Sequence, residues 1–186
     1  MESFGRVVVV SLAALAVVLI CSKNIVAAED PEFGVIRDLC ERTTNQDFCF
    51  SMLSSDKRSR GMNFGELIRL SIVVSNEKGK EGKNHILELQ KQTTDPLLKK
   101  ILDHCSGQYD IGVLDDTQDA LNEYNQGDYR LAAISVGSCV NGIETCEDAF
   151  RSPPYPTNIL RETNEYVKKH CFVSVQLVDS ISKSTN

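Results

Sequence analysis

Residues 128–150 read DYRLAAISVGSCVNGIETCEDAF, and this stretch decides the fold. Its large apolar side chains and cysteines recur at steps of three and four residues, the period of one face of an α-helix. The stripe consists of Tyr129, Ala132, Val136, Cys139, Ile143, Cys146 and Phe150. A long helix with one continuous apolar stripe is typical of a helical bundle.

A second helix of the same kind precedes this one. Asp95 and Pro96 are a typical helix start, because aspartate caps the first turn and proline is tolerated within it. The link between the two helices contains Gly127, which suits a helix C-terminus, and Asp128, which suits the next N-cap. The stripe of the earlier helix consists of Leu98, Leu102, Cys105 and Tyr109, and continues less regularly to Leu121 and Tyr124. The sequence therefore predicts an antiparallel hairpin that turns near residue 126.

Two pairs of cysteines lie symmetrically about expected turns. Cys105 and Cys146 are nearly equidistant from the turn near residue 126, so the hairpin brings them level, and we expect a disulfide bond. Cys40 and Cys49 flank a second turn at residues 44–45 in the same way. In the chain-entropy model these bonds stabilise the fold by about 4 and about 2.7 kcal/mol.

The remaining pair, Cys139 and Cys171, stays open. A last helix follows the helix-breaking residues 152–156, and both cysteines are about equidistant from that link, which allows a third disulfide. However, Cys139 shares its face with Cys146, which is expected to point toward the preceding helix. Two buried free thiols, a common state for cysteine, are therefore the favoured alternative. The stripe of the last helix consists of Leu160, Asn164, Val167, Cys171, Ser174, Val178 and Ile181.

Residues 62–74 are also helix-like. Residues 76–84, NEKGKEGKN, interrupt this helical pattern with charged residues and two glycines. We interpret them as a weakened, solvated helix or as a loop, with helix resuming over residues 85–92. The whole pattern predicts an all-α fold. It is an up-down-up-down four-helix bundle, residues 61–183, preceded by an N-terminal disulfide-closed helical hairpin, residues 29–60.

The N-terminus predicts export. Residues 1–28 combine a short leader carrying Arg6, an apolar run from Val7 to Cys21, and small residues before an acidic pair, which is the pattern of a signal peptide. A signal anchor is the rival, but the apolar run is shorter than the roughly 20 residues of a membrane-spanning helix. Cleavage removes Cys21, leaves an even number of cysteines and changes the net charge from −6 to −7. An acidic chain without a further apolar run argues against nucleic acid and membrane as partners.

Catalytic patterns are weak. His85, His104 and His170 fall in different helices without a metal-ligand spacing, and we interpret them as surface or boundary residues. Asp115, Asp116, Asp119 and Glu123 are spaced to chelate a cation or exchange protons, but a solvated helix face explains them more simply. We therefore expect no metal and no cofactor, and a binding protein rather than an enzyme.

Several segments carry a family resemblance. Residues 36–49, IRDLCERTTNQDFC, and the blocks LDHC at residues 102–105 and CEDAF at residues 146–150 resemble the plant invertase and pectin methylesterase inhibitor family. The resemblance implies a helical hairpin on a four-helix bundle, with one disulfide in each hairpin. It also implies a secreted protein that blocks the substrate cleft of plant acid invertase (β-fructofuranosidase) or pectin methylesterase, in the apoplast or cell wall, or else in the vacuole.

The target is not resolved by the resemblance. Invertase inhibitors carry a Pro-Lys-Phe triplet at the turn entering the third bundle helix, whereas this chain has GDYRL at residues 127–131. For invertase, the candidate contacts are Asp128, Tyr129, Arg130 and Leu131, with Arg130 as the cation. For pectin methylesterase, they are the exposed faces of the second and third bundle helices with Asp115, Asp116, Asp119 and Glu123. Residues 95–100 and 145–148 resemble a pollen-allergen-like branch of invertase-inhibitor relatives, which gives a slight preference for that target.

A different class of function remains as an alternative. A secreted helical protein closed by disulfides could carry a lipid or another small ligand in its bundle. The adjacent cysteines and the Cys-x-Cys motif of plant lipid-transfer proteins are absent from this sequence, which argues against that role.

Overall fold

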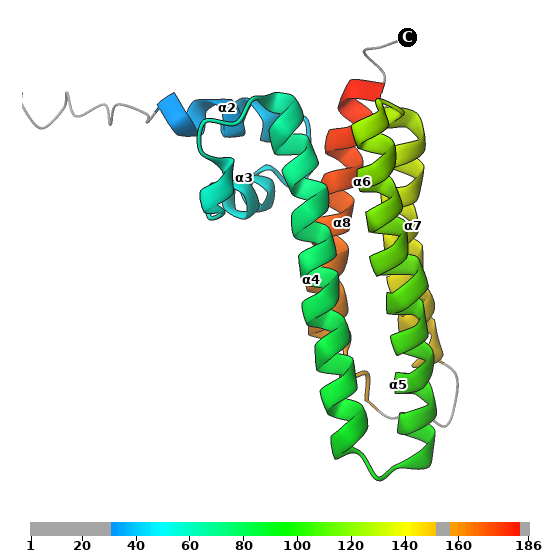
Figure 1. The fold of residues 1–186 in the computed structure, drawn as a ribbon. Helices are drawn as coiled ribbons and strands as arrows, with labels where there is room; N and C mark the ends of the chain where they lie inside the picture. Colours follow the sequence, from blue (N-terminus) through cyan, green and yellow to red (C-terminus); the bar gives the residue numbers. More distant parts are fainter. Residues whose placement is uncertain (1–30, 152–156, 183–186) are drawn as a thin grey trace, which may run out of the picture. The chain divides into compact units, whose positions relative to one another are not determined.

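The computed structural model describes residues 31–151 and 157–182, which form helices, turns and short links. Two short helices, α2 (Pro31–Cys40) and α3 (Gln46–Ser54), and the 3₁₀ turn η1 (Lys57–Ser59) come first. Long segments of alternating direction follow (Figure 1). They are α4 (Phe64–Gln92), the unbroken run of α5 (Pro96–Gln108), η2 (Tyr109–Asp115) and α6 (Asp116–Gln126), then α7 (Tyr129–Ala149) and α8 (Arg161–Ser182). This confirms the predicted all-α fold, a four-helix bundle preceded by a helical hairpin.

Two expectations lie outside the described residues. They are the signal peptide of residues 1–28 and the helix-breaking residues 152–156. The exact domain bounds therefore stay a prediction. None of the helices in the described ranges combines the length and the apolar character that crossing a bilayer requires.

The helix ends follow the signals in the sequence. Asn63 and Glu66 form a reciprocal capping box at the start of α4, and Asp95 accepts hydrogen bonds from the first turn of α5. Gly127 ends α6 at φ +82°, a left-handed conformation that glycine adopts without a Cβ penalty. Asp128 then accepts a 3.0 Å hydrogen bond from the Leu131 amide and begins α7.

The interior contains two apolar clusters. One joins the α2–α3 hairpin to α4, α6, the start of α7 and the end of α8, and includes Ile36, Leu39, Leu53, Leu67, Ile72, Val136 and Leu177. The other joins the end of α4 to α5, η2, α7 and the start of α8, and includes Ile86, Leu102, Tyr109, Val113, Ile143, Leu160 and Val167. The hairpin therefore shares one core cluster with the bundle.

Residues 76–84 are helical and do not interrupt α4, so the helix alternative is correct and the loop alternative is wrong. Gly79 and Gly82 are buried where α4 meets η2. A Cβ on Gly82 would lie 2.6 Å from Tyr109 Cε1, and one on Gly79 would lie 2.6 Å from Val113 Cγ1. These glycines allow α4 and η2 to approach closely. The charged residues between the two glycines are exposed to solvent on the outer face of α4.

The second long segment contains a π-helical stretch, η2, that the sequence did not predict. A π-turn holds more residues than an α-turn and rotates the following side chains, which explains why the apolar stripe becomes irregular after Tyr109. At Gly112 the backbone of η2 meets that of Gly142 on α7, since a Cβ on Gly112 would lie 2.8 Å from the Gly142 Cα. The Tyr109 hydroxyl donates a buried 2.9 Å hydrogen bond to Asn164 Oδ1 on α8.

Three disulfide bonds link the six cysteines of the described residues. The bonds Cys40–Cys49 and Cys105–Cys146 are the pairs that the spacing predicts. Cys139 and Cys171 are also bonded, so the favoured reading of two free thiols is wrong. Cys139 and Cys146 do share a face of α7, but that face points to the bundle interior and borders the helices on both sides. One sulfur therefore reaches α5 while the other reaches α8.

Candidate functional site

The turn from α6 to α7 presents the first set of candidate contacts. Asp128 is exposed, but its carboxylate is engaged by the Leu131 amide as the helix cap. The Tyr129 ring packs against the Tyr124 ring, with centroids 5.0 Å apart, and is half-buried. Arg130 is exposed, as is Leu131 at 41%. Arg130 and Leu131 are thus available to a partner, while Tyr129 belongs largely to the core.

An exposed apolar side chain that the sequence analysis missed extends this surface. Ile134 is 54% exposed and lies one turn beyond Leu131 on α7. Neither Leu131 nor Ile134 belongs to the buried stripe of α7, and this displacement from the stripe was the signal that could have identified both. Leu131 and Ile134 together give α7 a small exposed apolar area next to the turn, which a protein partner could cover.

The four acidic candidates lie on α6 and at its start. Asp115 and Asp119 are exposed, while Asp116 and Glu123 are half-buried. Burial, and after it the nearby Asp119, raise the pKa of Asp116 above its ordinary range. Glu123 Oε2 is sealed from solvent and has no hydrogen-bond partner among the described residues. The carboxylates therefore interact with one another electrostatically, in an arrangement that favours a partner with positive or hydrogen-bond-donating groups.

The structure brings the two candidate sets onto one hairpin. Gly112 lies opposite Gly142, and the turn at Gly127 is midway between them. In this register Glu123 is level with Leu131, and Asp119 is level with residues 134–135. The acidic residues and the turn residues thus lie along adjacent lengths of α6 and α7, and we call this strip the α6–α7 surface.

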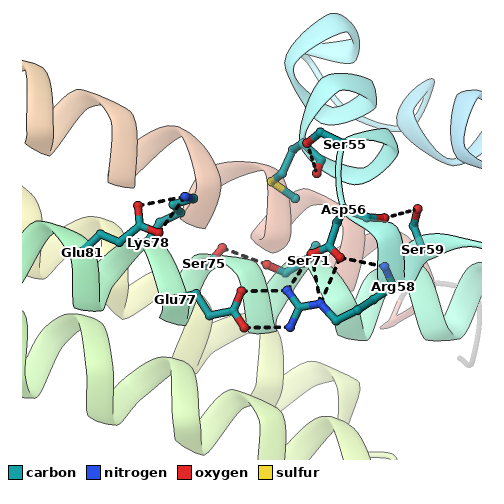
Figure 2. Close-up of polar contacts among 10 residues, drawn as sticks. Ser55, Asp56, Arg58, Ser59, Ser71, Ser75, Glu77, Lys78 and Glu81 are labelled. Atoms are coloured by element: carbon teal, nitrogen blue, oxygen red, sulfur yellow. Dashed lines mark hydrogen bonds and ion pairs between the residues drawn. The ribbon is translucent and has the colours of Figure 1, made fainter.

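A second polar cluster lies where the N-terminal hairpin meets the bundle (Figure 2). The Arg58 guanidinium donates hydrogen bonds of 2.7 Å to both carboxylate oxygens of Glu77 on α4, and a third of 2.6 Å to Asp56 Oδ2. Hydrogen bonds from Arg58 hold the pKa values of Asp56 and Glu77 below their usual range, although partial burial opposes this shift. Arg58 therefore fastens η1 to the middle of α4.

The histidines differ from one another. His85 and His104 are exposed, as the sequence predicts. His170 is only 3% exposed, so its interpretation as a surface or boundary residue is wrong. Its ring packs edge-on against Phe48 of α3, with centroids 4.9 Å apart, which the sequence could not reveal because the contact joins distant segments.

Comparisons with known proteins show a family relationship. The family model described as plant invertase/pectin methylesterase inhibitor matches residues 34–177. A pectinesterase inhibitor of Actinidia deliciosa is 33% identical over 129 residues, covering 69% of this chain and 69% of the relative. A Platanus orientalis protein whose name assigns it provisionally to the invertase inhibitors is 26% identical over 138 residues, covering 73% of this chain and 81% of the relative.

A solved structure supports the fold. The crystal structure of mutant form A of a pectin methylesterase inhibitor from Arabidopsis superposes with a TM-score of 0.64 at 17% identity, and the match covers 81% of this chain and 97% of that one. The family match extends from the hairpin to the last helix, across the elements that carry both polar clusters. The chain therefore belongs to the plant invertase/pectin methylesterase inhibitor family.

Proposed function

We propose that this protein is a non-covalent inhibitor of a plant carbohydrate-active enzyme, either pectin methylesterase or acid invertase, and is not itself an enzyme. The observation that carries this proposal is the family match over residues 34–177, which spans the hairpin and nearly the whole bundle. Two relatives support the proposal, one named for each kind of target: a pectinesterase inhibitor and a cell wall/vacuolar inhibitor of fructosidase.

The α6–α7 surface is the contact we propose. It combines Arg130 with the exposed apolar residues Leu131 and Ile134 and with the carboxylates level with them on α6. Protein interfaces of standard size bury about 800 Å² per partner, with apolar and arginine anchors near the centre and polar groups at the rim. A strip of apolar residues bordered by charges on a rigid helical hairpin fits that description.

Different observations favour the two targets. The 33% identity to the Actinidia pectinesterase inhibitor favours pectin methylesterase, and so does the acidic face of α6. The provisional Platanus invertase inhibitor and the exposed Arg130, which can donate charge-assisted hydrogen bonds to cleft carboxylates, favour invertase. The turn residues of the α6–α7 surface are the candidate contacts for invertase, and its acidic residues are the candidate contacts for pectin methylesterase.

We further propose that the protein is secreted and acts in the cell wall, or alternatively in the vacuole. Three disulfide bonds, one in the N-terminal hairpin and two in the bundle, favour an oxidising compartment, because such bonds rarely persist in the cytosol.

The test is a titration of the protein, purified from the medium of cells that secrete it, against a plant pectin methylesterase and a plant acid invertase between about pH 4.5 and 7. Stoichiometric loss of activity in one assay identifies the target. If neither enzyme loses activity while circular dichroism shows a folded helical protein, the proposed function is wrong.

A further inference from the structure

A pocket of about 580 Å³ lies between the N-terminal hairpin and the bundle, away from the α6–α7 surface. Its walls come from α3, η1, α4 and α8, and Figure 2 shows several of its polar side chains around Arg58. We call it the junction pocket. Its volume falls within the range of roughly 300–1,000 Å³ that small-ligand sites occupy.

His170 gives the pocket a hydrogen-bond acceptor without a partner among the described residues. Its Nδ1 lies 2.8 Å from the Tyr166 carbonyl oxygen, so this nitrogen carries the proton and donates. The neutral ring then leaves Nε2 as an acceptor, and among the described residues Nε2 has no partner. The side chain is 97% buried, since only 3% is exposed, and it lines the junction pocket. An acceptor that lines a pocket and has no protein partner can accept a hydrogen bond from a ligand that enters the pocket.

Tyr166 and Phe48 give the pocket an aromatic wall. The Tyr166 ring is 48% exposed, and its centroid is 4.5 Å from that of His170. Lys78 Nζ lies over the Tyr166 ring, 5.9 Å from its centroid, and the Phe48 ring packs edge-on against it at 6.4 Å. The face of such a ring is negative and attracts weakly positive C–H groups as well as cations.

The charged groups of the wall balance one another. Lys57 and Lys78 are cationic, and Asp56 and Glu77 are anionic. Arg58 donates one hydrogen bond to each carboxylate oxygen of Glu77. The remaining lone pairs of these oxygens can accept hydrogen bonds from a ligand. A net charge near zero gives no advantage to an anionic ligand, and a purely apolar ligand would leave these polar groups unpaired.

We infer that the junction pocket binds a neutral mono- or disaccharide. Such a molecule offers C–H groups to the Tyr166 ring and hydroxyl groups that both donate and accept. One hydroxyl donates to His170 Nε2, another donates to Glu77, and Lys57 donates to a sugar oxygen. This site is separate from the α6–α7 surface and does not depend on which enzyme the protein inhibits.

The test uses the secreted protein labelled with ¹⁵N and titrated with glucose and with sucrose, while amide shifts are recorded. Galacturonate and decanoate serve as anionic and apolar comparison probes. We expect saturable shifts confined to amides around Tyr166, His170 and Ser55 with a neutral sugar. Tyr166→Ala should weaken this binding about tenfold, as expected for the loss of a main contact.

Two further variants make the test specific. His170→Phe keeps the aromatic packing and removes the acceptor, so it should also weaken binding about tenfold. Phe172→Ala removes an aromatic side chain of similar exposure, 46%, from the same helix but outside the pocket, and should leave the affinity unchanged. The inference is wrong if neutral sugars cause no shifts, if the shifts lie elsewhere, if Tyr166→Ala binds as well as the wild type, or if only galacturonate or decanoate binds.

Discussion

Arg58 and Glu77 form two parallel hydrogen bonds of 2.7 Å each, and this pair connects the end of the N-terminal hairpin to the middle of α4. Asp56 binds the same guanidinium through Nε and Nη2, so one arginine is shared by two carboxylates. Forked arginine–carboxylate pairs of this geometry are stronger and more directional than single ion pairs. The arrangement therefore orients the hairpin on the bundle and also shapes one wall of the junction pocket.

Replacing Arg58 with alanine should lower the free energy of unfolding by about 1 kcal/mol, since the pair is forked but partly exposed and therefore screened by solvent. Urea unfolding followed by circular dichroism measures this change. Lys91→Ala is the matched control, because it removes an exposed ion pair with Glu88 within a single helix and should change the free energy by less than about 0.5 kcal/mol. Equal effects of the two variants would contradict a special role for Arg58.

The contribution of Arg58 should also depend on pH. The pKa values of Asp56 and Glu77 are lowered in the folded protein because Arg58 donates hydrogen bonds to both carboxylates. Their stabilisation is therefore complete above the unfolded carboxyl pKa of about 4 and is lost as the pH falls through the lowered folded values. Unfolding of the wild type and Arg58→Ala from about pH 7 down to pH 2 measures this. A constant difference between them would show that the carboxylates are not involved.

Leu131→Asp should raise the inhibition constant at least about fivefold, because it places a charge in the centre of the proposed enzyme contact. Leu97→Asp is the matched control. The two leucines are 41% and 40% exposed, and each donates its amide to the capping aspartate at the start of its helix. The run from Pro96 to Gln126 is about 45 Å long, so one interface of standard size does not cover both leucines. A larger effect of Leu97→Asp would move the contact to the other end of the hairpin.

Labelling of the secreted protein, unfolded but not reduced, with iodoacetamide should add no mass, since signal-peptide cleavage removes Cys21 and the six cysteines of the described residues are in disulfides. Mass spectrometry reads the result directly. Two labels, on Cys139 and Cys171, would instead support the free thiols that the sequence favoured. Removing both partners of Cys105–Cys146 by alanine should cost about 4 kcal/mol, and removing those of Cys40–Cys49 about 2.7 kcal/mol, because the first bond closes the longer loop.

Gly82→Ala should destabilise the protein by about 1–3 kcal/mol, because the new methyl group would overlap the buried Tyr109 ring. Gly107→Ala is the control, since its Cβ meets nothing within 4 Å in the middle of a helical run. That variant should stabilise the protein by up to about 1 kcal/mol through helix propensity alone. Thermal unfolding of both variants measures the contrast. Stabilisation by Gly82→Ala would mean that α4 and η2 are not in close contact.

The sequence predicts those parts of the fold that depend on local or periodic information. The stripe of α7, the cap at Asp128 and the left-handed Gly127 each depend on residues within a few positions of one another. The level pairing of Cys105 with Cys146 needs only a count along two straight helices. These features were predicted correctly because helix geometry fixes them before any tertiary packing is known.

The features that sequence reasoning missed depend on contacts between distant segments. The sequence around Gly79 and Gly82 leaves a weakened helix or a loop open, because the packing partners of these glycines, Val113 and Tyr109, lie in a different helix. His170 was placed near the surface, because the Phe48 ring that covers it comes from the N-terminal hairpin. The π-helical stretch rearranges hydrogen bonds to suit packing against α7, and no local residue pattern specifies that rearrangement.

The pattern of disulfides makes the bundle tolerant of proteolytic nicks. A cut at Gly127 leaves the two fragments joined through Cys105–Cys146, and a cut between α7 and α8 leaves them joined through Cys139–Cys171. A cut between α4 and α5 is different, since none of the three bonds crosses that link. Among proteases, this protein would remain one covalent piece after either of the first two cuts, whereas a cut in the link between α4 and α5 would separate it into two polypeptides.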